Sequence, residues 1–463
     1  MKYFIRFITI VVSALIFIAC EDKVNFGDNN YTIVSVSPRG SANTSTDIPT
    51  TKLIIKVNDD RLALVSDDIK INANFSVLKG ELTSIGIMTY ELIIIPGNSG
   101  TIRVGLDPYR GFTGWNAKTA SVYTDWNFSV NTDNTLTITG YNHAGNSLTI
   151  PSKLPKLPET NGYLVTAIGY RAFFDRSLLS VIIPDSIKDI GDSAFVYNQL
   201  SKINIPDGVV SIGRTSFAFN QLSKVIIPNN VTVIGYGAFA YNQLNSVTIS
   251  ISVTSIESSA FAYNQLAAVT IPASVDSIED YAFENNKLKN IVIPYGVLSI
   301  GNGAFGNNQL EEVEIPNSIV FLSGFNDNKL EKITIPNNVV SIGNNAFANN
   351  KLKNDVVIPN NVKTIDSYAF AHNEITNVTI SNKITTIERG TFAYNKLTKI
   401  VVPDSVKNIG IYAFMENPLT SITIGENVTL GSSSFGNGFE SFYYNNSRKK
   451  GTYTFSGNTW TIP

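Results

Sequence analysis

Hydrophobic and polar residues follow one another in a unit that recurs about every 22 residues from Ala172 to Phe435. In one copy, residues 200–205 alternate apolar and polar side chains, as expected for a strand with one buried face. Pro206 ends this strand because it has no N–H for a ladder hydrogen bond. Apolar residues return in the following segment, and Phe217 fills the coil. The unit predicts a stack of short β-coils.

Phenylalanine marks the period most clearly. Successive copies from Phe195 to Phe305 are 22 residues apart, the step to Phe325 is 20, and the later steps are 22, 23, 22, 22 and 21. A fixed period of this length is typical of a solenoid, in which each coil buries its apolar face against its neighbours. We therefore predict repeats over residues 171–436, an N-terminal cap over 125–170 and a C-terminal cap over 437–463, which ends in a hairpin.

Asparagine lies three residues after the phenylalanine in eleven consecutive coils. An amide carries both donors and acceptors, so it can satisfy backbone groups at the corner of a coil. A structural ladder is the favoured interpretation, and a row of ligand-binding amides is the alternative. The residues are Asn198, Asn220, Asn242, Asn264, Asn286, Asn308, Asn328, Asn350, Asn373, Asn395 and Asn417.

The repeat resembles the BspA-like subclass of bacterial leucine-rich repeats, whose pattern is roughly Leu-x-x-Ile-x-Ile-Pro-x-x-Val-x-x-Ile-Gly-x-x-Ala-Phe-x-x-Cys. Asparagine replaces the family's cysteine here, and the coil is typically one residue shorter. The resemblance implies a surface protein that attaches to host matrix or to other cells. The matching residues in one coil are Pro228, Val231, Ile234, Gly235, Ala238 and Phe239.

Residues 1–19 have the pattern of a secretory signal: a positive end, an apolar core and a small residue before the cleavage site. Cys20 is the only cysteine, and Phe17-Ile-Ala-Cys20 resembles a lipobox with phenylalanine where leucine is usual. We therefore predict lipidation at Cys20, with ordinary signal cleavage as the alternative. Residues 20–30 are polar and predict a tether. The chain is then expected in a bacterial envelope, lipid-anchored to the outer membrane and surface-exposed.

Residues 31–124 contain several short β-rich runs separated by glycine, proline, asparagine and aspartate, which predicts an antiparallel sandwich. The segments Lys79-Gly-Glu-Leu-Thr and Thr89-Tyr-Glu-Leu resemble bacterial immunoglobulin-like spacer domains. The expected fold is thus mainly β: an Ig-like β-sandwich followed by a leucine-rich repeat solenoid. The resemblance implies a domain that lifts the repeats away from the membrane.

Composition and motifs favour binding over catalysis. Hydrophobic residues are 43% of the chain and charged residues 16%, which suits a folded body with a continuous core. A formal net charge of −2 gives no indication of nucleic-acid binding. His143 and His372 lack metal-type spacing, and neither a phosphate-binding glycine motif nor a nucleophile elbow occurs. We predict no cofactor and no enzymatic activity.

Three surface features remain as candidate binding sites. An aromatic row is expected from Tyr197, Phe219, Tyr241 and Tyr263, with sugar stacking or inter-coil packing as its two interpretations. A lysine-rich edge in the later coils is either an anionic-glycan site or a solvated edge; it contains Lys287, Lys329, Lys351 and Lys396. The third feature is the set of strand residues that point away from the core, which we place on a concave sheet.

The outward strand residues are the favoured ligand-binding set because packing leaves them free to vary. We predict that they bind an extracellular protein or glycan and mediate adhesion; the alternatives are a scaffold or spacer without a dedicated ligand and, more distantly, an enzyme. The residues are Lys202, Lys224, Ile226, Thr248, Thr270, Val292, Glu312, Glu314, Lys332 and Lys399.

Overall fold

A computed structural model describes residues 126–142, 145–154 and 163–462 of the 463-residue chain, and the strand backbones that precede residue 126. The chain divides into two compact units, which are described separately. The first comprises Met1–Phe173 and Ile183–Asp189, and the second Phe174–Ile182 and Ile190–Pro463. Cys20 and His143 lie outside the described residues, and in the predicted signal and tether the structure describes only the strand backbones Thr9–Val11, Lys23–Phe26 and Asn29–Thr32.

The first unit contains antiparallel pairs and the beginning of the repeat region. Strand β5 pairs with β1, β4 and β8, β8 pairs with β7, and β9 pairs with β6 and β10. Closer to the repeats, β11 pairs with β12 antiparallel and β12 with β15 parallel. The Ig-like assignment stays a prediction. The strands are β1 (Thr9–Val11), β2 (Lys23–Phe26), β3 (Asn29–Thr32), β4 (Pro38–Arg39), β5 (Thr51–Lys56), β6 (Ile69–Asn72), β7 (Val77–Gly86), β8 (Thr89–Pro96), β9 (Gly100–Leu106), β10 (Lys118–Val122), β11 (Trp126–Val130), β12 (Leu136–Tyr141), β13 (Ser147–Thr149), β14 (Lys153–Leu154) and β15 (Tyr163–Ile168).

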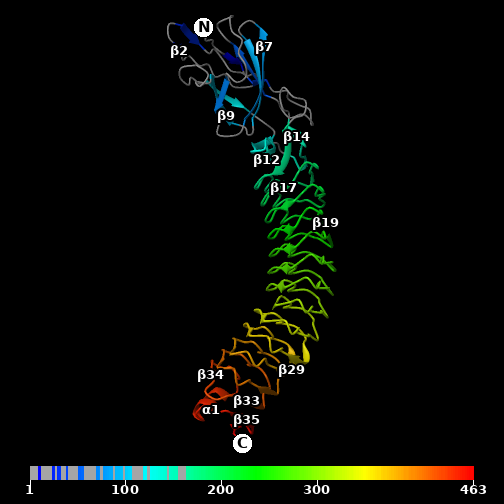
Figure 1. Cartoon of the computed structure of the whole chain (residues 1–463), viewed down its shortest axis with the longest axis vertical. Helices are drawn as coiled ribbons and strands as arrows, with labels where there is room; N and C mark the ends of the chain where they lie inside the picture. The colour runs from blue at the N-terminus through cyan, green and yellow to red at the C-terminus, as the bar shows by residue number, and fades with distance from the viewer. Residues whose placement is uncertain are drawn as a thin grey trace. The chain divides into compact units, whose positions relative to one another are not determined.

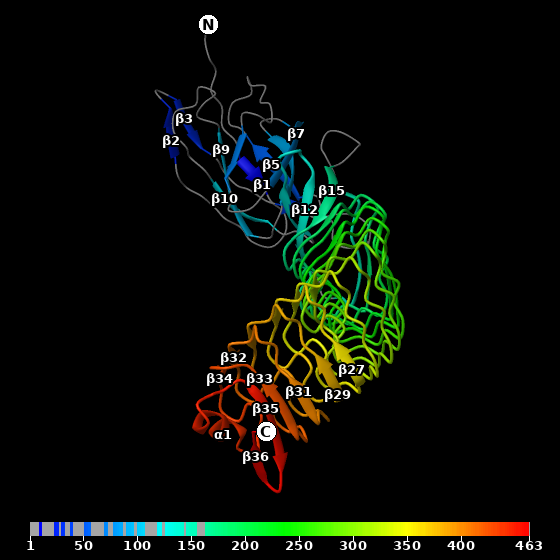
Figure 2. The same cartoon turned by 60° about the horizontal axis from the view of Figure 1, so that its bottom comes forward.

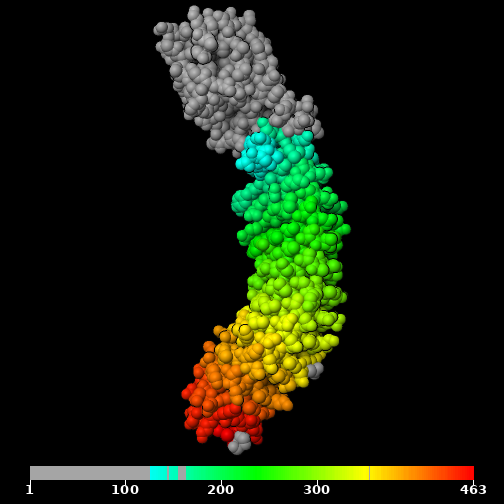
Figure 3. All heavy atoms as spheres, in the orientation of Figure 1, coloured from blue at the N-terminus to red at the C-terminus, as the bar shows by residue number. Residues whose placement is uncertain are grey.

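The second unit is a stack of similar coils that follow one another from top to bottom in Figures 1 and 3, coloured from green to red. Its most regular element, which we call the inner sheet, consists of parallel two-residue strands, one per coil. Each strand ends in a buried Ile or Leu preceded by a more exposed residue. The inner-sheet strands are β18 (Ser211–Ile212), β20 (Val233–Ile234), β22 (Ser255–Ile256), β23 (Ser277–Ile278), β24 (Ser299–Ile300), β25 (Phe321–Leu322), β26 (Ser341–Ile342), β28 (Thr364–Ile365), β30 (Thr386–Ile387), β32 (Asn408–Ile409) and β34 (Thr429–Leu430); β17 (Asp189–Ile190) lies at the boundary of the units.

The Leu-x-x-Ile-x-Ile segments form a second, interrupted row, which we call the outer strand row. Strands β19 and β21, β27 and β29, and β31 and β33 pair in parallel, whereas Val292 and Glu314 form only an isolated bridge. Residues 201–205, 267–271 and 331–335 are not in strands. The row consists of β16 (Ser180–Ile182), β19 (Lys224–Ile226), β21 (Ser246–Thr248), β27 (Lys353–Val357), β29 (Glu374–Thr379), β31 (Lys399–Val401) and β33 (Ser421–Ile424).

This arrangement corrects the predicted concave sheet. Figures 1 and 2 show the second unit bending, with β32 and β34 on the inner side of the bend and β29 and β31 on the outer side. The outward strand residues, placed on a concave sheet from the sequence, therefore lie on the outer side. Coils are further apart on the outside of a bend, so backbone hydrogen bonds there do not span every pair of coils. On the inner side the ladder is longer: it runs from β17 to β28 and again from β30 to β34.

The core of the second unit is a single stack of phenylalanine rings. Twelve rings from Phe195 to Phe435 are 0–2% exposed, and consecutive centroids lie 5.0–5.8 Å apart with nearly parallel planes. Because each ring contacts the rings of both adjacent coils, every coil is stabilised chiefly by its neighbours. The prediction of a leucine-rich repeat solenoid with a period near 22 residues is confirmed.

The 20-residue coil fits the stack through a glycine. Gly324 immediately precedes Phe325 and has φ +92°, a conformation that residues with a side chain rarely adopt. A Cβ at this position would lie 2.5 Å from the carbonyl oxygen of Gly301 in the preceding coil. Because the backbones of the two coils approach closely at Gly324, a coil with two fewer residues can still place Phe325 in the phenylalanine stack.

The last coil is covered by helix α1 (Phe439–Asn445) and the hairpin of β35 (Gly451–Ser456) and β36 (Thr459–Thr461). Phe439 ends the phenylalanine stack by meeting Phe435 edge-on, with centroids 5.0 Å apart. The Tyr443 hydroxyl donates to the Gly425 carbonyl at 2.6 Å and accepts from the Val428 N–H at 3.2 Å. The Tyr444 hydroxyl accepts from the Leu430 N–H at 2.9 Å, so a side chain occupies a backbone group of β34, the last strand of the inner sheet, whose edge would otherwise be open.

The Tyr443 contacts predict a loss of stability at alkaline pH. Burial raises the pKa of the Tyr443 hydroxyl, so the folded chain keeps this proton to higher pH than the unfolded chain does. Its contribution is complete below about pH 10, the ordinary tyrosine value, and declines as pH rises through the raised pKa. The thermal midpoint should therefore fall more steeply above about pH 10 in the wild type than in Tyr443→Phe. Parallel curves in pH-dependent melts would contradict this assignment.

Candidate interaction surfaces

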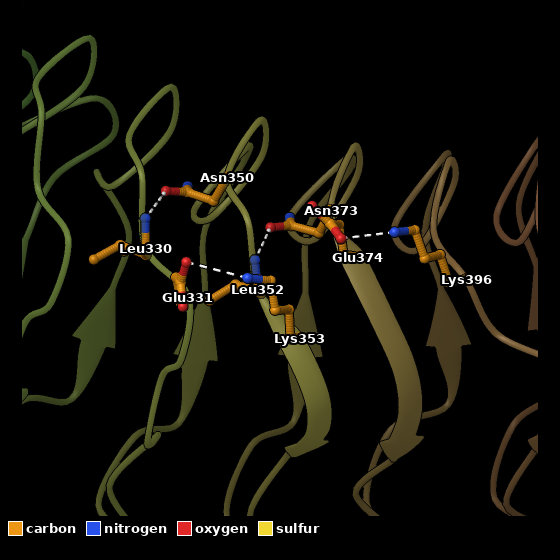
Figure 4. Close-up of polar contacts among 8 residues, drawn as sticks. All are labelled: Leu330, Glu331, Asn350, Leu352, Lys353, Asn373, Glu374 and Lys396. Atoms are coloured by element: carbon orange, nitrogen blue, oxygen red, sulfur yellow. Dashed lines mark hydrogen bonds and ion pairs between the residues drawn. The ribbon is translucent and has the colours of Figure 1, made fainter.

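The eleven asparagines form one hydrogen-bonded ladder that links each coil to the preceding one. In every case Oδ1 accepts from the N–H of the Leu, or of Ile375, that lies one coil earlier, at 2.9–3.1 Å. Asn350 and Asn373 make this contact with Leu330 and Leu352 in Figure 4. For Asn264, Nδ2 donates to the carbonyls of Phe239, Phe261 and Ala262 at 2.9–3.2 Å.

The ladder side chains face the coil interior. Their exposed fractions are 6–9%, and both amide atoms are engaged by backbone groups. A ligand at the surface therefore has no amide to contact along this row. The geometry favours the structural interpretation of the asparagines over the ligand-binding one, and we propose that their function is to pair the corners of the coils.

The inner rings of the aromatic row, Phe219 and Tyr241, are closed to stacking by sugars. Tyr197, Phe219, Tyr241 and Tyr263 are 37–49% exposed, but their rings stack on one another with centroids 4.3–4.6 Å apart. Each inner ring has both faces covered by its neighbours, so only edges and hydroxyls are presented to solvent. A sugar stacks on a ring face, so this geometry favours inter-coil packing. Exposed His372 stacks on Tyr394 in the same way, with centroids 4.3 Å apart.

Two lysines in the region of the lysine-rich edge pair with carboxylates of adjacent coils. Lys353 pairs with Glu331 at 3.1 Å and Lys396 with Glu374 at 2.6 Å (Figure 4). The hydrogen bond from Lys396 lowers the pKa of Glu374. The two pairs reduce the cationic character that an anionic glycan would require, which favours the interpretation of a solvated edge.

A shallow hollow of about 860 Å³ lies where this edge meets the outer strand row. Its lining mixes both charge signs, and it brings together Glu312 and Lys332, two of the outward strand residues. Such a surface suits polar contacts of both signs better than a polyanion. The lining residues are Lys289, Asn290, Glu311, Glu312, Lys329, Glu331, Lys332 and Lys351.

All ten outward strand residues are exposed. Ile226, Val292 and Val401 of this row are 54%, 81% and 62% exposed, while their inward neighbours are buried. The inward residues repeat from coil to coil, and the outward ones change. The structure thus separates a fixed interior from a variable exterior, although the row spans the outside of the bend.

Among the described residues, no group of three or more His, Cys, Asp or Glu side chains could hold a metal ion. Within the ranges that the structure describes, no helix has the length and apolar character to cross a bilayer.

The sequence of the repeat region decides the family. Residues 156–267, 254–323 and 320–440 match the BspA type leucine-rich repeat region, so the match extends over more than half of the chain. The chain belongs to the BspA-type leucine-rich repeat family. No curated protein matches it.

Several solved structures are similar to this BspA-type chain. A leucine-rich repeat protein from Bacteroides ovatus is 23% identical, with 67% of this chain and 90% of that one covered and a TM-score of 0.53. A leucine-rich cell surface protein from Faecalibacterium prausnitzii is 25% identical, with coverages of 66% and 88% and a TM-score of 0.44. The pneumococcal vaccine antigen PcpA is 20% identical, with coverages of 67% and 84% and a TM-score of 0.46. The Bacteroides ovatus structure supports the fold.

Proposed function

We propose that this BspA-type protein is a lipid-anchored surface protein whose solenoid binds an extracellular protein or glycan and mediates adhesion. The observation that carries the proposal is the contrast between repeated inward residues and varied, exposed outward residues along the outer strand row. Packing explains why the inward positions repeat, whereas nothing in the coil requires the outward sequence. The hollow beside Glu312 and Lys332 is the centre of the proposed site.

The mixed charge of the hollow supports a protein partner over a nucleic acid. The lining contains four lysines and three glutamates, and the formal net charge of the chain is −2. Nucleic-acid sites carry an excess of cations. The length of the row is sufficient for a standard interface of about 800 Å² per partner. A spacer without a dedicated ligand remains the second candidate, supported by the regular stacking of the coils.

Exchanging the two charges at the hollow tests the binding proposal. The variant Glu312→Lys with Lys332→Glu keeps the net charge and should weaken attachment to immobilised matrix proteins and glycans about tenfold. Its thermal midpoint should stay unchanged because both side chains are exposed. The matched control is Glu388→Lys with Lys407→Glu, which exchanges two exposed charges beside the inner sheet. Equal attachment by both variants would exclude the outer strand row as the site.

The anchor is tested separately at Cys20. This residue follows the signal-like segment and is the only cysteine of the chain. Cys20→Ala should abolish metabolic labelling with a fatty acid and move the protein out of the membrane fraction. Cys20→Ser is the conservative control, and it should behave in the same way because a hydroxyl does not replace the acylated thiol. Labelling that persists in both variants would rule out lipidation at this position.

A further inference from the structure

We infer a second binding site on the inner sheet, for an extended peptide segment of another protein that carries a basic residue, apolar residues and an acidic residue in that order or its reverse. The site is a strip of exposed and partly exposed side chains on five consecutive coils, which we call the charged-end strip. It lies on a different face from the proposed adhesion site and does not depend on it. Its residues are Asp276, Leu298, Val320, Phe321, Val340 and Lys363.

Backbone hydrogen bonds place these residues side by side. The N–H of Leu298 donates to the carbonyl of Asp276 at 2.8 Å, that of Val320 to Leu298 at 2.9 Å, that of Val340 to Val320 at 2.9 Å, and that of Lys363 to Val340 at 2.9 Å. Five residues of the strip therefore form one uninterrupted column. Phe321 follows Val320 and is the aromatic member of the adjacent column, between Ser299 and Ser341.

The apolar residues of the strip have no structural requirement. Leu298 and Val320 are 52% and 46% exposed, and Phe321 and Val340 are partly exposed. Coils of the same architecture carry Thr232, Thr254 and Thr385 at the position of Leu298, so a polar residue folds equally well there. Three consecutive apolar residues at this position, with a phenylalanine beside them, form a contiguous exposed apolar patch of the kind that marks protein interaction sites.

The two ends of the strip carry opposite charges. Asp276 and Lys363 are exposed, and in the described part of the chain neither side chain has a hydrogen bond or ion pair within the protein. Four steps of about 4.8 Å between adjacent strands separate them by about 19 Å. A partner that covers the apolar centre meets a carboxylate at one end and an ammonium group at the other.

The spacing selects an extended peptide. Side chains on one face of an extended chain lie about 6.6–6.8 Å apart, so residues 1, 3, 5 and 7 of a heptapeptide span about 20 Å. A basic residue at position 1, apolar residues at 3 and 5, and an acidic residue at 7 match the charged-end strip. The backbone N–H groups of the column are already used between coils, so recognition proceeds through side chains and tolerates either chain direction.

Panning a phage-displayed random heptapeptide library on the full chain tests this site. Enriched peptides should carry opposite charges at positions 1 and 7 and apolar residues at 3 and 5. The variant Leu298→Thr with Val320→Thr copies residues of other coils, so it folds, and it should bind the synthesised peptides at least about tenfold more weakly. Val210→Thr removes an equally exposed apolar residue outside the strip and serves as the matched control.

Reversing the charge at one end of the strip gives the decisive test of which peptides it binds. Asp276→Lys leaves both ends of the strip basic, so panning on this variant should enrich peptides that are acidic at both ends. The site is overturned if the enriched peptides lack paired charges, if the threonine variant binds them as well as the wild type, or if no peptide binds below about 1 mM. Loss of adhesion in the Glu312 and Lys332 variant would leave these outcomes unchanged, so the two proposals fail independently.

Discussion

Replacing Phe261 with alanine should lower the free energy of unfolding by about 3–5 kcal/mol, because the ring is lost from a fully enclosed site. The Phe261 ring is 0% exposed and stacks between Phe239 and Phe283, with centroids 5.6 and 5.4 Å away. Both neighbours lose a contact surface at once, and the backbone of the stack cannot close the gap without shifting adjacent coils. Denaturant melts followed by circular dichroism measure the change.

Val292→Ala is the control for this experiment. It also truncates an apolar side chain in the same repeats, but Val292 is 81% exposed, so the expected change is below about 0.5 kcal/mol. If the two variants shift the midpoint equally, the phenylalanine stack is not the main source of cohesion between coils. A broader transition in Phe261→Ala would indicate that the coils on its two sides unfold separately.

Replacing Asn264 with alanine should cost about 1–3 kcal/mol, since it leaves buried backbone groups without partners. The Leu244 N–H loses its acceptor at 3.0 Å, and the Phe239 carbonyl loses a donor at 2.9 Å. Asn264→Asp should also destabilise, because the carboxylate retains the acceptor but has no N–H to give the three carbonyls.

Gln265→Ala provides the comparison one residue further on. The Gln265 side chain is exposed, and its amide oxygen accepts a hydrogen bond from Lys287 Nζ at the surface, at 3.3 Å. The expected cost is below about 0.5 kcal/mol. A similar midpoint shift for the two alanine variants would show that the asparagine ladder contributes little to stability.

The repeat, its core phenylalanine and the buried corner position were all accessible from the sequence. The core and the corner positions each carry a residue of one type at a constant spacing. Few residue types meet their physical requirements, which are a large ring in the core and a short amide at the corner. Leucine-rich repeat architecture follows from these two features with the strand-like segment 200–205. The outward positions of the outer row were also identified, since alternation alone separates them from buried ones.

The position of the inner sheet could not be predicted from the sequence. The strands of the inner sheet are only two residues long, which is too short to leave an alternating pattern in the sequence. The longer Leu-x-x-Ile-x-Ile pattern does alternate, so the concave sheet was predicted there, although these segments lie on the outer side of the bend. Curvature arises from the difference in coil separation between the two sides, which depends on packing over many coils. Helix α1 was missed because seven residues rich in aromatics give no helical period.

The aromatic row shows another limit of sequence analysis. Tyr241 and Tyr263 have φ +54° and +55°, a left-handed conformation that is unfavourable for bulky residues. Later coils place Asn285, Asn307 and Asn349 at the same position, with φ of +52° to +55°. The asparagines are the local signal for this conformation, whereas the tyrosines are tolerated because their rings stack on one another. The left-handed backbone sets the orientation of the tyrosine rings, and the stacking that results covers the ring faces on which a sugar would stack.

Two coils differ in length from the others, and this difference bears on how a repetitive chain avoids incorrect pairing between similar coils. In an array of interchangeable coils, one coil could dock on the wrong neighbour and loop out the 22 residues between them, with nearly the same contacts formed. The 20-residue coil that relies on Gly324 and the 23-residue coil that ends at Phe370 differ in length from the rest, so a shifted docking would bring coils of unequal length together. We therefore expect the two irregular coils to favour the correct pairing of coils during folding, because irregular features fix the register of a symmetric assembly.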